Sequence, residues 1–173
     1  MAFDLSGVRE EIEKEDDQRE QVIKVSRDVL KLSKSAIYSL HRNEIGKADT
    51  LIQRARGIVV DSLFPITEGY PNLRWGSLSN ALEEWAEAII FYYFIVHHRL
   101  PTLAELPLKI NKEEYLGGLL DFTGELNRYA VLQATKRNVD KVIACHAVIE
   151  QLSGYTPFHY YSSHIALPLT LLF

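Results

Sequence analysis

The stretch that decides the fold is KEEYLGGLLDFTGELNRYAVLQATKR, residues 112–137. Its apolar residues recur at three- and four-residue steps, which predicts a helix. One face of this helix carries small and charged residues: Glu114, Gly117, Gly118, Asp121, Glu125 and Arg128. The other faces are largely apolar: Leu116, Leu119, Leu120, Phe122, Leu126, Tyr129 and Ala130. Glycine inside a helix costs roughly 1 kcal/mol relative to alanine, so the glycine pair and Gly124 predict close approach of another helix or of a ligand.

The segment that precedes it, residues 78–98, also has a helical pattern that changes character halfway. Up to residue 87 the segment is amphipathic, whereas residues 88–96 are apolar on every side, which is typical of the centre of a core or of an interface. Ser77 or Ser79 is expected to cap this helix, and Glu83 and Glu84 lie near its start, where the helix dipole favours anions.

Towards the N-terminus, residues 17–42 and 47–63 are two further amphipathic segments. The first has a regular apolar stripe: Val22, Val25, Val29, Leu32, Ala36 and Leu40. The second has another: Ala48, Leu51, Ile52, Ala55, Ile58, Val59 and Leu63. Prolines and glycine predict a loop at 64–75, a short helix is expected at 102–106 and a last one at 138–153. No stretch alternates with period two, so the predicted fold class is all-α, a helical bundle with a long first helix.

The general composition restricts the class of protein. A chain of 173 residues with 47% hydrophobic and 24% charged residues is typical of one globular domain. A single cysteine excludes an intramolecular disulfide, and the N-terminus lacks the features of a signal peptide, so we expect a cytoplasmic protein. The longest apolar run is about half of the roughly 20 residues that cross a bilayer, so no membrane span is expected.

The charge distribution is more informative than the net charge of −4, which by itself argues against nucleic-acid binding. Basic residues form a stripe at helical spacing on the first segment: Lys24, Arg27, Lys31, Lys34 and Arg42. Arg54 and Arg56 of the second segment could extend this surface. The stripe could be a solvated helix face or a surface that binds phosphates.

Two carboxylate pairs suggest chemistry. Glu84 and Glu87 are three residues apart and Asp121 and Glu125 are four apart, so each pair shares one face of its helix. If the two helices pack side by side, four carboxylates gather where only a cation could keep them all ionised. An all-oxygen set selects Mg²⁺, or Mn²⁺. The alternative is two unrelated, solvated pairs.

Other residues that could carry chemistry are expected to be structural. Cys145 and His146 are adjacent, so on a helix they point apart, and Cys145 is expected in the core. His97 with His98, and His159 with His164, lack the partner spacing of a metal site. The aromatic residues of the third helix are also expected in the core: Trp85, Tyr92 and Tyr93.

Three ordered motifs resemble those of the translin and translin-associated factor X family. The most specific is DFTGELNR at 121–128, and the others are SRDVLKLSKSAIYSLHR at 26–42 and LEEWAEAIIFYYFI at 82–95. The resemblance covers about residues 16–155 of the single predicted domain, 1–173. Beyond Gly154 the family continues with a long helix, whereas Pro157 and Pro168 exclude one continuous helix here, so the tail 155–173 is atypical or truncated.

The resemblance implies a function. Because translin itself largely lacks the first pair, Glu84 and Glu87 place the chain in the catalytic, translin-associated factor X branch, as a prokaryotic, archaeal-type member with one kind of subunit. It implies a Mg²⁺-dependent endoribonuclease in which Glu84, Glu87 and Asp121 are metal ligands and Glu125 is a fourth ligand or orients water. The cation would polarise the scissile phosphate and activate the attacking water. The basic stripe, Arg54, Arg56 and Arg128 would bind RNA, single-stranded or structured.

An assembly is expected on two grounds. Residues 88–96, the apolar tail 165–173 and the long first helix offer more apolar surface than a small bundle can hide. The family's habit implies a homo-oligomer, an octamer or smaller, that encloses the RNA.

Two other functions stay open. One is a non-catalytic oligomer that binds single-stranded RNA or DNA, as translin does. The other is an all-α nucleotide pyrophosphohydrolase, which also presents carboxylate pairs to Mg²⁺ but leaves the basic stripe without a role.

Overall fold

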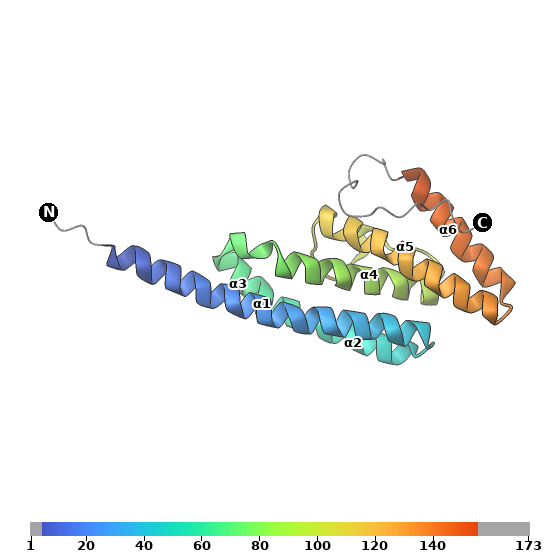
Figure 1. The fold of residues 1–173 in the computed structure, drawn as a ribbon, viewed down its shortest axis with the longest axis horizontal. Helices are drawn as coiled ribbons and strands as arrows, with labels where there is room; N and C mark the ends of the chain where they lie inside the picture. The colour runs from blue at the N-terminus through green and yellow to red at the C-terminus, as the bar shows by residue number, and fades with distance from the viewer. Residues whose placement is uncertain (1–4, 156–173) are drawn as a thin grey trace. The chain divides into compact units, whose positions relative to one another are not determined.

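The described residues, 5–155 of a computed structural model, contain helices and no strand (Figure 1). In chain order these are α1 (Ser6–His41), α2 (Ile45–Ile58), the π-helical turn η1 (Val59–Leu63), α3 (Phe64–Gly69), the 3₁₀ turn η2 (Pro71–Arg74), α4 (Ser77–His97), the 3₁₀ turn η3 (Leu103–Glu105), α5 (Lys112–Thr135) and α6 (Val139–Tyr155). The all-α prediction is confirmed. Within this described part, no helix is long and apolar enough to span a bilayer.

By its internal contacts the chain divides into two compact units, Met1–Glu125 and Leu126–Phe173, and α5 contributes to both. All four carboxylates of the predicted site belong to the first unit. In the second unit Cys145 is buried on α6, as expected, and burial raises the pKa of its thiol to about 11. The predictions for the tail, including His159, His164 and the apolar run 165–173, lie outside the described residues.

The core of the first unit is built where α1 packs on α2 and α4, and α2 on α4. The predicted apolar stripes point into this core, with Val29, Ala36 and Ile52 fully buried. Trp85 of α4 is also fully buried, and its Nε1 donates a hydrogen bond to the carbonyl oxygen of Ile52 at 3.3 Å. The periodicity of the sequence therefore identified the inward faces of these helices correctly.

Helix α1 begins at Ser6, eleven residues before the expected start at residue 17, so that boundary was wrong. The added turns are rich in charged residues with good helix propensity. They also carry i,i+4 ion pairs, Arg9 Nε to Glu13 Oε1 and Arg19 Nη2 to Glu15 Oε1, both at 2.7 Å. Exposed pairs of this kind contribute only about 0.3–0.5 kcal/mol each, so propensity and continuity with the buried part of α1 explain most of the extension.

The prediction of a loop at 64–75 was wrong for its first half. Phe64–Gly69 forms α3, with Pro65 in its first turn, where the fixed φ of proline is compatible with a helix. The π-helical turn η1 joins α2 to α3 without a break. The short helix expected at 102–106 is confirmed as η3, which Thr102 and Glu105 close with a capping box.

Helix α4 has the expected extent but not the expected cap. Its N-cap is Gly76, whose φ of 77° lies in the left-handed region that favours glycine, and no side chain caps the helix. Ser79 instead donates its hydroxyl to Glu114 Oε1 at 3.0 Å. The expected serine cap is therefore absent because this hydroxyl has another acceptor.

The apolar half of α4 lies in the core of the protomer. Ala88, Ile90 and Phe91 are fully buried, and the rings of Phe91 and Phe94 pack against Phe122 of α5. Tyr92, Tyr93, Ile95 and Val96 stay partly exposed, so residues 88–96 offer less apolar surface for an assembly than predicted. Large apolar residues that are more than half exposed lie elsewhere: Leu5, Val8, Ile12, Tyr38, Trp75, Val131, Val139 and Ile143. The first three lie together at the start of α1.

Candidate active site

The glycine pair of α5 is explained by the backbone of α4. A Cβ atom on Gly118 would lie 2.6 Å from Ala86 Cβ and 2.7 Å from the carbonyl oxygen of Glu83. A Cβ atom on Gly117 would lie 2.9 Å from the side chain of Glu83. Only glycine lets the two helices approach this closely, so the prediction of a close approach is confirmed for both residues. Gly124 has nothing within 4 Å and is not explained in this way.

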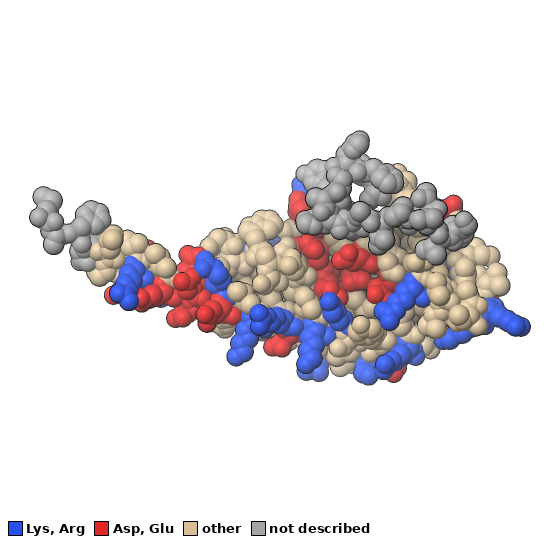
Figure 2. Space-filling view, in the orientation of Figure 1, with Lys and Arg blue, Asp and Glu red and all other residues tan. Residues whose placement is uncertain are grey.

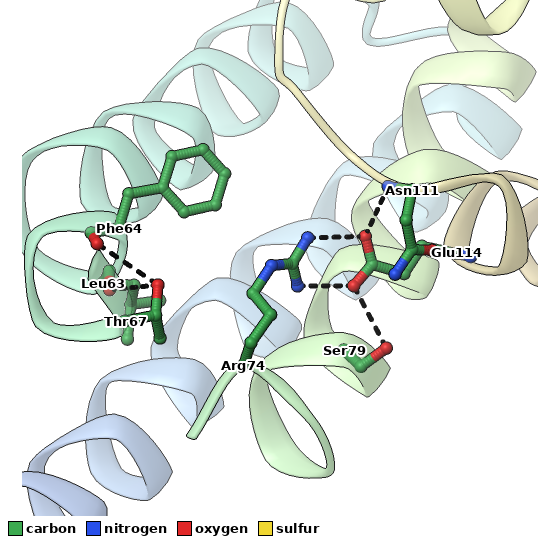
Figure 3. A network of polar contacts seen from close by, with 7 residues as sticks. All are labelled: Leu63, Phe64, Thr67, Arg74, Ser79, Asn111 and Glu114. Carbon is green, nitrogen blue, oxygen red and sulfur yellow. Dashed lines mark hydrogen bonds and ion pairs between the residues drawn. The ribbon is translucent and has the colours of Figure 1, made fainter. Parts of the chain in front are cut away.

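An ion pair fixes the start of α5 (Figure 3). Both guanidinium NH₂ groups of Arg74 donate to the Glu114 carboxylate, which has no exposed surface, and the contact from Nη2 to Oε2 measures 2.7 Å. The backbone N–H of Asn111 and the Ser79 hydroxyl also donate to this carboxylate. The helical position of Glu114 suggested that it belongs to an open acidic face, and this was wrong. It anchors the first turn of α5 to η2 and to the first turn of α4.

With α5 held in this register, the two predicted carboxylate pairs lie in one electrostatic cluster. Burial raises the pKa of Glu87 to about 8, and the charges of Glu84, Asp121 and Glu125 add to this rise. The Glu87 side chain is nearly inaccessible, at 6% exposure. Burial also raises the pKa values of Glu84 and Asp121. Figure 2 shows the acidic side chains gathered over the region of α4 and α5.

Two residues at this site were not predicted from the sequence. The Glu83 side chain lies against Gly117, and its pKa is raised by burial and by Asp121. His41, near the end of α1, places Nε2 2.5 Å from Glu125 Oε2, and its ring lies 5.0 Å from that of Phe91. A seven-residue step along α1 separates His41 from Lys34, so the shared helix face was a sequence feature that could have identified it.

The predicted basic residues fall into different environments. Lys24, Arg27 and Lys31 are exposed on α1 and have no ion pair with another described residue. Lys34, on the same helix, places Nζ 3.7 Å from Glu84 Oε2. The others are distributed as follows: Arg42 directly after α1, Arg54 exposed on α2, Arg56 donating its Nε to the Pro107 carbonyl oxygen, and Arg128 exposed in the second unit. The exposed stripe therefore consists of three residues of α1, and its role in binding stays a prediction.

The donor set suits a hard divalent cation in type and charge. All its members are carboxylates, and their mutual repulsion would be relieved by a bound cation. Glu87 is buried, Glu84 and Glu125 are partly buried, and Asp121 is exposed. In the described part of the chain, however, no three acidic, histidine or cysteine side chains are placed together as metal ligands. Glu84 is paired with Lys34 and Glu125 with His41. The donor set therefore fits such an ion by its chemistry, whereas its side chains as placed do not form a ready set of ligands.

Comparison with known proteins identifies the family. Residues 17–164 match the sequence model of the translin family. The chain belongs to the translin family. Within this family's fold, the segment 121–128 serves both core and site: Phe122 and Leu126 are fully buried, while Asp121 and Glu125 contribute to the carboxylate cluster.

Two curated proteins and several solved structures are similar to this translin-family chain. An uncharacterised protein of Methanocaldococcus jannaschii is 28% identical over 128 residues, which is 71% of this chain and 54% of the relative. The translin-associated protein X homologue of Schizosaccharomyces pombe is 23% identical over 143 residues, 76% of this chain and 62% of the relative. The chain thus spans between half and two thirds of the length of these relatives.

The solved structures share the translin fold. The structure of apo-NeC3PO superposes with a TM-score of 0.77 at 27% identity, over 88% of this chain and 80% of that one. AfC3PO gives 0.77 at 24% identity, and its complex with duplex RNA gives 0.76 at 22%, each over 89% of this chain and 80% of the other. At these last identities the likeness concerns the fold alone.

Proposed function

We propose that this protein is a Mg²⁺-dependent endoribonuclease that binds and cleaves RNA as a cytoplasmic homo-oligomer. The observation that carries the proposal is the placement of Glu84, Glu87, Asp121 and Glu125 in one desolvated cluster on α4 and α5. A stable bundle has no need of such a cluster, because gathering like charges away from water opposes folding. A divalent cation would bind at this cluster because its charge relieves the repulsion among the carboxylates.

The residues of the cluster take different roles in this proposal. Glu84, Glu87 and Asp121 would hold Mg²⁺ or Mn²⁺, which supplies Lewis-acid activation of a phosphate and of water when bound. Glu125, whose Oε2 contacts Nε2 of His41, would be a fourth ligand or would orient the attacking water.

Binding of RNA is assigned to the exposed stripe of α1. Lys24, Arg27 and Lys31 lie on the same helix as Lys34, so a phosphate backbone that follows α1 would lead to the acidic cluster. A structural relative, AfC3PO, has been solved as a complex with duplex RNA. This supports RNA, single-stranded or structured, as the substrate class.

The assembly is proposed from the exposed start of α1 and from family membership. Leu5, Val8 and Ile12 lie at three- and four-residue steps, so their exposed side chains form one apolar stripe that a second subunit could cover. We propose a homo-oligomer of eight subunits or fewer. Light scattering at micromolar concentration tests this, and a monomer of about 20 kDa, the mass of one chain, would contradict it.

Cleavage of labelled RNA with Mg²⁺ and with EDTA tests the enzyme directly. We expect cleavage only with Mg²⁺, and loss of cleavage with retained binding in Asp121→Asn. Cleavage that survives EDTA, or an Asp121→Asn variant as active as the wild type, would refute the proposed role of the cluster.

One observation favours a second candidate, a non-catalytic RNA- or DNA-binding oligomer. Lys34 already pairs with Glu84 and His41 already contacts Glu125, and in the described residues no three acidic side chains are arranged to hold an ion. This candidate predicts that the wild type binds RNA or single-stranded DNA and cleaves neither, with Mg²⁺ present.

A further inference from the structure

Lys34 differs from the other cations of α1 in what it faces. Its Nζ lies 3.7 Å from Glu84 Oε2, whereas Lys24, Arg27 and Lys31 form no ion pair with any described residue. The Glu84 side chain is mostly buried, at 18% exposure, while that of Lys34 is 52% exposed. The lysine therefore approaches the cluster from the solvent side, where it contacts Glu84.

The field of Lys34 reaches beyond Glu84. It lowers the pKa of Glu84, of Asp121 and, more weakly, of Glu87, against the raising effect of burial on each. The other group with a basic nitrogen at this site, His41, is placed on Glu125 instead. Among the described residues, Lys34 is thus the basic side chain that forms an ion pair with a carboxylate assigned above as a metal ligand, Glu84.

We infer that the Lys34 ammonium is the built-in counterion of the carboxylate cluster when no metal is bound and that it must leave Glu84 when a divalent cation binds, so that Lys34 sets the metal affinity. This inference rests on the proposed function. Two cations cannot share one set of carboxylates without strong repulsion at these short distances. A half-exposed lysine with a flexible four-carbon stem can move into solvent at little cost, which a buried arginine could not do.

The test compares Lys34→Gln with Lys31→Gln in the metal-stripped full-length protein, without RNA. Both variants remove one positive charge from exposed positions one turn apart on α1, so general electrostatic effects are matched. Titration calorimetry with MgCl₂ and MnCl₂ gives the dissociation constant, and thermal unfolding gives the stability without metal. We expect Lys34→Gln to bind the cation about tenfold more tightly than Lys31→Gln, and to unfold at a lower temperature than Lys31→Gln when no metal is present.

The outcomes separate the inference from the proposed function. Equal metal affinities in the two variants, or weaker binding by Lys34→Gln, would overturn the counterion role while leaving the metal site in place. A wild type that binds neither ion would overturn the metal-dependent function and the inference with it. Lys34→Arg keeps the charge and should retain the wild-type affinity more closely than Lys34→Gln, which also covers the case in which the glutamine variant does not fold.

Discussion

Substitution of Gly118 by alanine tests how α4 and α5 bring the carboxylates together. A Cβ atom at this position would lie 2.7 Å from the backbone nitrogen of Glu87 and 2.6 Å from Ala86 Cβ. These are backbone atoms and a short side chain, which cannot turn aside, so the helices must separate. Overpacking of this kind costs typically about 1–3 kcal/mol, which outweighs the gain of roughly 1 kcal/mol in helix propensity.

Gly124→Ala is the matched control on the same helix, because nothing lies within 4 Å of its added Cβ. It should stabilise the protein by about 0.5–1 kcal/mol. The free energies of unfolding of the two variants should therefore differ by roughly 1–3 kcal/mol, the overpacking cost, because the gain in helix propensity is common to both. Gly117→Ala should fall between them, since its Cβ meets the movable side chain of Glu83.

Urea unfolding followed by circular dichroism measures these differences, at one protomer concentration because an oligomer unfolds in a concentration-dependent way. The midpoints should fall in the order Gly124→Ala, wild type, Gly118→Ala. If Gly118→Ala is as stable as Gly124→Ala, then α4 and α5 do not pack as closely as described, and the argument that glycine assembles the cluster fails.

Three further predictions concern charge. Burial and neighbouring carboxylates raise the Glu87 pKa from 4.5 to about 8, so the folded state retains a proton that the unfolded chain releases, and stability is lost as pH rises from about 4.5 to 8. Glu87→Gln avoids this loss. Without metal, its effect on the free energy of unfolding should be near zero at pH 4.5 and stabilising by up to about 3 kcal/mol at pH 7. An equal effect at both pH values in thermal unfolding would contradict the assignment. Arg74→Met leaves the buried Glu114 carboxylate without its cation and should cost about 3–5 kcal/mol in urea unfolding, whereas Arg74→Met combined with Glu114→Gln should recover part of it. Replacing Lys24 and Arg27 by glutamine should lower the salt dependence of single-stranded RNA binding by about 1.4 in the log–log slope, and an unchanged slope would exclude these residues from the interface.

The parts of the fold that follow from local periodicity could be predicted from the sequence. The buried stripe of α1, the extents of α4 and α5 and the all-helical class needed only the spacing of apolar residues. The early start of α1 was missed because its first turns are largely charged and precede the regular apolar stripe of this helix. The helix α3 was missed because Pro65 was taken as a breaker, although a proline in the first turn is compatible with a helix.

The site was harder to predict, because spacing shows which residues share a face but not what faces them. The four carboxylates were named from two helical spacings and belong to one cluster in the structure. The same method placed Glu114 on the acidic face, since nothing in the spacing showed that Arg74, forty residues earlier, would bind it. His41 was missed for the same reason, because its partner Glu125 is 84 residues away.

Three locally unfavourable features converge on the contact between α4 and α5. A glycine pair inside a helix, a buried ion pair at Glu114 and a buried carboxylate at Glu87 each oppose stability compared with an apolar alternative. The first two have a common geometric effect, since they hold α5 close to α4 and fix its position along that helix. The third is the result, because that position sets Asp121 and Glu125 near Glu84 and Glu87. Locally unfavourable features that together produce one arrangement of side chains are expected at a functional site. Substitutions that abolish function should therefore be sought first in the carboxylate cluster, rather than in the exposed basic stripe of α1.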